Sequence, residues 1–96
     1  MARADIEVRN PSGLHARPAA TFVRASGAFK SEIRVTNLTR DAAKSASAKS
    51  VLGVMGLGVA RGHRVRIDAD GADAEVAVAS LVELIAGGLG EELDDG

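Results

Sequence analysis

The chain has 96 residues, and its 12 lysines and arginines against 13 aspartates and glutamates give a formal net charge of −1. It has no cysteine, which excludes disulfides, thiol catalysis and cysteine-ligated zinc. Because it lacks a basic excess and has two phenylalanines but no tryptophan or tyrosine, we expect no nucleic-acid partner.

The first part of the chain combines a strand pattern with a helix pattern. Apolar and polar residues alternate over residues 5–9, which predicts a strand, and the turn-forming residues 10–13 end it. Apolar residues then recur at helical spacing over residues 19–26. Because Pro18 is tolerated only in the first turn of a helix, we expect this helix to begin next to His15.

The rest of the chain adds further strands and two helices. Alternation predicts strands over residues 32–38 and 64–69, and the polar segment 39–49 is expected to hold a turn and a short third strand. The apolar segment 50–58 contains glycines that restrict it to a brief helix, and residues 72–86 predict the last helix. This order of elements indicates an α+β fold with helices packed on one face of an antiparallel sheet.

Length predicts one domain over residues 1–90, followed by an acidic tail over residues 91–96. No apolar run approaches the ~20 residues that cross a membrane. Residues 1–9 alternate and do not form the apolar core of a signal peptide. We therefore expect a cytoplasmic protein that does not insert into the membrane. The sequence carries no sign of oligomerisation, so we expect a monomer.

His15 stands where the first helix is expected to begin. A histidine in such a turn is ordinarily a surface residue. The start of a helix, however, has unpaired backbone N–H groups and a partial positive charge, which favour a neutral, nucleophilic imidazole and then a phosphate bound there. This contribution is only ~0.3–1 kcal/mol, so it tunes a site without creating one. Arg17 is either an exposed first-turn arginine or a guanidinium that binds phosphate oxygens in pairs.

Two stretches resemble the signatures of one known family. The first is GLHARPAA at residues 13–20, followed by Phe22 and Val23. The second is KSVLGVM at residues 49–55, followed by LGV at residues 57–59. Both are similar to HPr, the histidine-containing phosphocarrier family of the bacterial phosphoenolpyruvate-dependent sugar phosphotransferase system. The resemblance implies an open-faced sandwich, in which a four-stranded antiparallel sheet carries three helices on one face in the order βαββαβα.

The resemblance also implies a function for the residues around His15. In this family enzyme I, which draws on phosphoenolpyruvate, phosphorylates the histidine on Nδ1, and the group then passes to the IIA component of a sugar transporter. Arg17 would steady the phosphoryl group, and backbone N–H groups near Ala16 and Arg17 would complete the cradle. Arg24 lies seven residues after Arg17 on the same helix face and either adds to a basic rim or is an ordinary solvated arginine. Such a protein is a carrier and not an enzyme, and it needs no cofactor.

An apolar docking patch is expected on the second helix. Val51, Leu52 and Met55 correspond to the family positions that form this patch beside the histidine, although apolar residues of a short helix are also candidates for the core. We expect these three to be partly exposed and Val54 and Leu57 to point inward. Small exposed apolar patches mark binding sites, and methionine suits a surface that meets several partners.

Ser50 corresponds to the serine that some lineages phosphorylate for carbon-catabolite control, which would make an HPr serine kinase/phosphorylase a further partner. It is also a favoured residue for capping the helix that follows. The segment 38–49 is a few residues longer than the family hairpin, so we expect a longer loop there. With two histidines, His15 and His63, and no cysteine, we expect no metal site.

Other functions stay open in the sequence. A phosphocarrier of a nitrogen branch, or one that serves a kinase in place of a sugar transporter, would keep the same chemistry. A regulatory binding module would have lost phosphotransfer, and the presence of both His15 and Arg17 counts against it. An enzyme would need a pocket and a second catalytic acid or base, and the acidic residues here are scattered along the chain.

Overall fold

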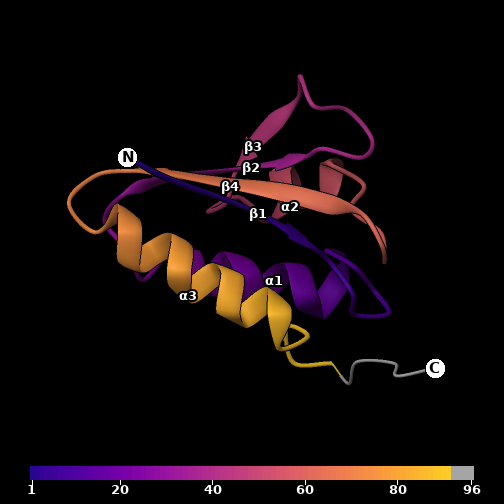
Figure 1. Cartoon of the computed structure of the whole chain (residues 1–96). Helices are drawn as coiled ribbons and strands as arrows, with labels where there is room; N and C mark the ends of the chain where they lie inside the picture. The colour runs from indigo at the N-terminus through magenta and orange to yellow at the C-terminus, as the bar shows by residue number, and fades with distance from the viewer. Residues whose placement is uncertain (92–96) are drawn as a thin grey trace.

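Seven elements follow one another along the chain in the predicted order. The structure is a computed structural model that describes residues 1–91 (Figure 1). The strands are β1 (Ala2–Glu7), β2 (Glu32–Asn37), β3 (Ser45–Ser47) and β4 (Arg64–Asp70). The helices are α1 (Ala16–Ser26), α2 (Val51–Gly56) and α3 (Ala74–Ala86). Even α3, the longest of the described helices at 13 residues, is too short to cross a membrane.

The four strands form one antiparallel sheet in the order β1-β4-β2-β3. β4 pairs with β1 on one side and β2 on the other, so that Ile67 lies opposite both Ala4 and Val35. The helices cover one face of this sheet and leave the other open (Figure 1). This arrangement confirms the predicted open-faced sandwich.

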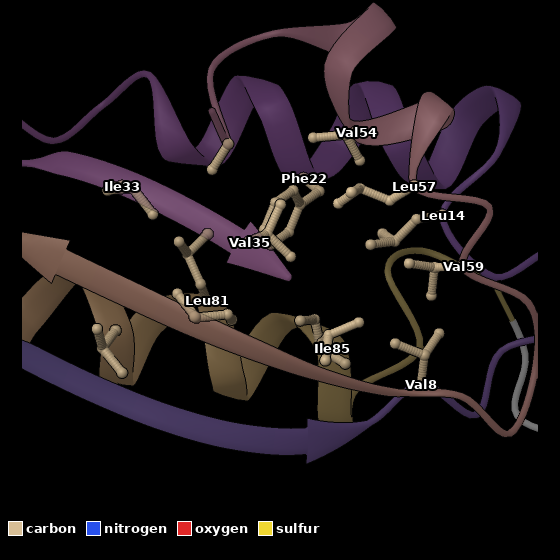
Figure 2. Close-up of a cluster of buried hydrophobic side chains, with 14 of the residues drawn as sticks. Val8, Leu14, Phe22, Ile33, Val35, Val54, Leu57, Val59, Leu81 and Ile85 are labelled. Carbon is tan, nitrogen blue, oxygen red and sulfur yellow. The ribbon is translucent and has the colours of Figure 1, made fainter. Parts of the chain in front are cut away.

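The hydrophobic core lies between the sheet and the helices (Figure 2). The ring of Phe22, from α1, lies beside Val35 of β2 and is fully buried. Leu81 contributes from α3, and Leu14 and Val59 fill the end of the core next to the start of α1. Truncation of a buried phenylalanine costs about 3–5 kcal/mol. The core therefore provides a rigid base for the segment that precedes α1.

The open face of the sheet carries charged side chains paired across β1 and β4. The Arg66 guanidinium donates to both carboxylate oxygens of Asp5, over 2.8 and 3.0 Å. Arg3 pairs with Asp68 two register positions further along. The hydrogen bond from Arg66 holds the pKa of Asp5 below its ordinary value. Charge pairing of this kind suits a face that meets water.

The boundaries of two elements, the first strand and the last helix, differ from the sequence predictions by two residues or more. The first strand was predicted over residues 5–9, but β1 runs from Ala2 to Glu7, because alanines provide its first half-buried positions. The last helix was predicted from residue 72, but α3 begins at Ala74. The carboxylate of its N-cap residue, Asp73, instead accepts from the N–H groups of Lys30 and Ser31, just before β2, which ties that end of the sheet to α3.

The connection between β2 and β3 covers residues 38–44, in the segment for which a longer loop is expected. Asn37 orders its first turn, because its side-chain oxygen accepts from the backbone N–H groups of Thr39 and Arg40, each over 3.2 Å. At the other end of the chain, the predicted tail begins at Glu91, and residues 92–96 lie outside the described residues.

Candidate functional site

His15 is the N-cap residue of α1 and is exposed. Its backbone is extended, with φ −124° and ψ 156°, as the N-cap position requires. Its side chain makes no capping hydrogen bond to the helix. The imidazole is therefore available to a reacting group that approaches from solvent, and the backbone N–H groups of the first turn of α1 have no partner within the helix.

The turn before His15 is fixed by a close approach that only glycine permits. Gly13 has φ +59°, and a Cβ atom built there would lie 2.3 Å from the carbonyl oxygen of Val59 and 2.9 Å from the Cα of Ala60. The next residue, Leu14, is fully buried, and its N–H donates to the same Val59 oxygen over 3.0 Å. Gly13 is the first residue of the GLHARPAA stretch, and this close approach is the physical reason for a glycine there.

Ala16, directly after His15, has a left-handed backbone with φ +51°. A non-glycine residue in this region costs roughly 1–2 kcal/mol. Leu14 and Pro18, on either side of this segment, are both buried. Such local strain is characteristic of functional sites. The sequence does not signal it, because alanine is not a residue that favours positive φ.

Arg17 is exposed in the first turn of α1, and Arg24 is exposed in the last turn of the same helix. Within residues 1–91, neither guanidinium has a hydrogen-bond or ion-pair partner. The first turn of α1 contains no acidic residue either. The positive end of the helix and the charge of Arg17 therefore add together beside His15, and this combination favours an anion.

The apolar residues of α2 divide as the sequence predicts. Val54 is fully buried and Leu57 is 5 % exposed, whereas Leu52 is 84 % exposed and Val51 39 %. Met55 is half-buried. The helix that carries these residues, α2, packs against α1, the helix that begins at His15.

Ser50 caps α2, as the sequence predicts. Its backbone is extended, and its Oγ accepts a hydrogen bond from the N–H of Gly53 over 3.0 Å. The residue is exposed, and the more exposed apolar residues of α2 follow it directly. A phosphate placed here would therefore bring negative charge to the edge of the apolar patch.

His63, the second histidine, has a structural explanation. Its Nδ1 accepts from the N–H of Ala60 over 3.2 Å and lies 3.1 Å from the side-chain nitrogen of Asn37. Two donors on one ring nitrogen assign the proton of the neutral ring to Nε2. His63 therefore ties the 60–63 turn to the end of β2. Within residues 1–91, no group of acidic, histidine or cysteine side chains is arranged to hold a metal ion.

Comparison with known proteins agrees with this geometry. The family model described as "PTS HPr component phosphorylation site" matches residues 2–87. The phosphocarrier protein HPr of Haemophilus influenzae is 47% identical over 81 residues, which cover 84% of this chain and 91% of that protein. The crystal structure of HPr-C-His from Thermoanaerobacter tengcongensis has a TM-score of 0.88 at 45% identity, covering 97% of this chain and 100% of that one.

Much longer relatives match as well. The multiphosphoryl transfer protein of Haemophilus influenzae is 48% identical over 86 residues, and that of Escherichia coli O157:H7 is 48% identical over 88 residues. The chain spans only 17% and 23% of the lengths of these two proteins. The family match over nearly the whole chain, the shared fold and the sequence identity lead to one conclusion: the chain belongs to the HPr family of phosphocarriers of the phosphotransferase system.

Proposed function

We propose that His15 accepts a phosphoryl group from enzyme I, which obtains it from phosphoenolpyruvate, and passes it to the IIA component of a sugar transporter. The observation that supports this most strongly is the exposed imidazole of His15, free of any capping bond, at the start of α1. A buried or hydrogen-bonded ring would not meet two partners in turn.

The chemistry of each transfer follows from this position. The Nδ1 lone pair attacks phosphorus, and a P–N bond forms while the bond to the donor breaks. In the onward step the same P–N bond breaks as the acceptor attacks. The N–H groups of Ala16 and Arg17 and the guanidinium of Arg17 bind the phosphoryl oxygens, and an exposed site leaves the group transferable.

Val51, Leu52 and Met55 form the surface on which both partners dock, and Arg24 extends the basic rim of the site. Since donor and acceptor use one surface, they bind in turn. Phosphorylation of Ser50 by a serine kinase would add a charge of about −1.5 to −2 at the edge of this surface and weaken the docking of an acidic partner. The host's kinase would thereby regulate transfer.

In this role the protein is a carrier, not an enzyme, and acts in the cytoplasm as a monomer without a cofactor. A dimer has been crystallised for HPr of Thermoanaerobacter tengcongensis. The identity to multiphosphoryl transfer proteins supports a circuit in which this chain exchanges phosphoryl groups with several proteins. A nitrogen-branch carrier would share the chemistry at His15, and a regulatory module would lack it.

The test is phosphoryl uptake from phosphoenolpyruvate labelled with ³²P, in the presence of enzyme I. We expect label that is labile in acid and stable in base, and that is absent from His15→Ala. His63→Gln is the matched control, because glutamine keeps an acceptor at a position outside the site, and it should take up label normally. Label on His15→Ala would contradict the assignment of the site to His15. No label with an active cognate enzyme I would contradict the proposal and favour the regulatory module.

A further inference from the structure

The chain that follows α3 returns to the turn before His15. Three residues of left-handed backbone, Gly88, Leu89 and Gly90, redirect it. Leu89 is 2 % exposed and joins the core, and its N–H donates to the carbonyl oxygen of Leu84 over 3.1 Å. A buried leucine with φ +54° shows that the path of this segment is imposed by packing.

This path brings the Glu91 carboxylate to the Asn10–Gly13 turn, where three donors converge on it. Oε1 accepts from Asn10 Nδ2 over 2.9 Å and from the N–H of Ser12 over 3.0 Å. Oε2 accepts from Ser12 Oγ over 2.8 Å. The hydrogen bond from Asn10, followed by those from Ser12, lowers the pKa of Glu91.

The contact continues through Asn10 to the residues beside His15. Asn10 is fully buried, and its Nδ2 also donates to the carbonyl oxygen of Gly13 over 2.9 Å, while the Gly13 N–H donates back to the Asn10 carbonyl over 3.1 Å. On the far side, Leu14 is bonded to Val59. The turn is therefore held from two directions, by Glu91 at one end and by Val59 at the other.

We infer that Glu91 is a positioning residue for His15: its carboxylate fixes the Asn10–Gly13 turn and thereby sets the direction of the imidazole for phosphoryl transfer. It does so through Asn10 and Ser12, without touching the phosphoryl group. This inference rests on the proposed function of His15. It links residues that are 79 and 81 positions apart in the chain.

The kinetic test compares Glu91→Ala with wild type in single-turnover uptake from phosphorylated enzyme I, over a range of carrier concentrations. Misplacement of a reacting group by about 1 Å costs up to ~100-fold, so for a loosened turn we expect a loss of roughly tenfold in the saturating rate. The half-saturating concentration should stay unchanged, because the docking residues on α2 are untouched.

Two further variants separate geometry from charge. In Glu91→Gln, the amide oxygen accepts from Asn10 and Ser12 as before, while Nε2 donates to the Ser12 hydroxyl, so most of the rate should return. Glu83→Ala removes an equal charge from the exposed side of α3 and should keep the wild-type rate. Equal losses in Glu91→Gln and Glu91→Ala would overturn the inference, as would a wild-type rate in Glu91→Ala.

Amide hydrogen exchange makes the inference independent of the proposed function. In wild type the Ser12 N–H is protected by Glu91, and Glu91→Ala should remove this protection while β4 keeps its own. Loss of protection in both places would indicate general destabilisation and overturn the positioning role. If wild type accepts no phosphoryl group, the proposed function fails, and unchanged Ser12 protection in Glu91→Ala would overturn the inference separately.

Discussion

The first turns of α1 and α2 both have backbone N–H groups without an intrahelical partner, but their N-cap residues treat these groups differently. At α2, Ser50 uses its own hydroxyl to bond an N–H of the first turn. At α1, His15 occupies the same position but leaves the first turn uncapped and its ring exposed. A cap of this kind contributes about 1 kcal/mol. The start of α1 lacks that stabilisation, and in the proposed function the N–H groups left free there bind the incoming phosphate.

Giving α1 the kind of cap that α2 has, by replacing His15 with serine, should produce the largest effect. His15→Ser places a capping hydroxyl on an extended N-cap residue, so the free energy of unfolding should rise by about 1 kcal/mol relative to His15→Ala. Phosphoryl uptake should be lost completely in both variants. Denaturant unfolding and labelling measured on the same preparations test this. Equal stability of the two variants would show that the start of α1 does not behave as an open cap.

Removal of the charge beside the uncapped helix should have the next largest effect. Arg17→Ala should slow transfer about 10- to 100-fold. Loss of one donor to a developing oxyanion in a buried site slows a reaction somewhat more than this, and the exposed site at His15 should lose less. Rapid-quench measurements in both directions of transfer provide the rate. Arg24→Ala is the matched control and should change the rate far less. Equal effects of the two substitutions would contradict the role given to Arg17.

Substitutions at Ser50, the N-cap of α2, should change the free energy of unfolding and the docking of partners, but not the rate of the chemical step. Ser50→Ala should lower the free energy of unfolding by about 1 kcal/mol. Ser50→Asp keeps a capping oxygen and adds one negative charge beside Val51 and Leu52. It should therefore raise the carrier concentration that half-saturates enzyme I and leave the saturating rate unchanged. A fall in the saturating rate alone would contradict the docking role of this surface.

The start of α3 provides a third case, with the smallest expected effect. Asp73 is its N-cap residue, but its carboxylate accepts from the Ser31 hydroxyl and from the N–H groups of Lys30 and Ser31, over 2.8 and 2.9 Å for the N–H groups. The Ser31 hydroxyl, followed by the Lys30 N–H, lowers the pKa of Asp73 from 3.8 to about 2.

The sign of the pH effect follows from that lowered pKa. The unfolded chain binds the proton more readily, so the stabilisation from Asp73 is complete above about pH 4 and is lost as the pH falls towards 2. Unfolding measured between pH 5 and pH 2 should therefore show a steeper decline for wild type than for Asp73→Asn. Parallel curves would contradict the assignment.

Much of the fold was predictable because it depends on local patterns. Alternation located β2 and β4 and part of β1, and Pro18 together with helical spacing located the start of α1. Ser50 followed by an apolar segment predicted a cap that the structure confirms. These features need only residues that are close in sequence, which is why the sequence alone was sufficient.

The features that the sequence missed depend on distant contacts or on strain. Glu91 is hydrogen-bonded to Asn10 and Ser12 only because the segment after α3 runs back to the turn before His15. From the sequence, Glu91 was predicted to lie in an acidic tail. The left-handed backbone of Ala16 has no signature in an alanine. The sequence signalled only a turn at residues 10–13. The burial of Asn10 and its bond to Glu91 are visible only in the structure.

The most direct test of the central claim is to locate phosphorus on the carrier itself. Nitrogen-15 NMR of the histidine rings, recorded before and after treatment with enzyme I and phosphoenolpyruvate, distinguishes Nδ1 from Nε2 and His15 from His63. If His15 carries the phosphoryl group, its Nδ1 should show a coupling to phosphorus, and the His63 ring should be unchanged. Phosphorus on His63 or on a serine, with the His15 ring unchanged, would contradict it.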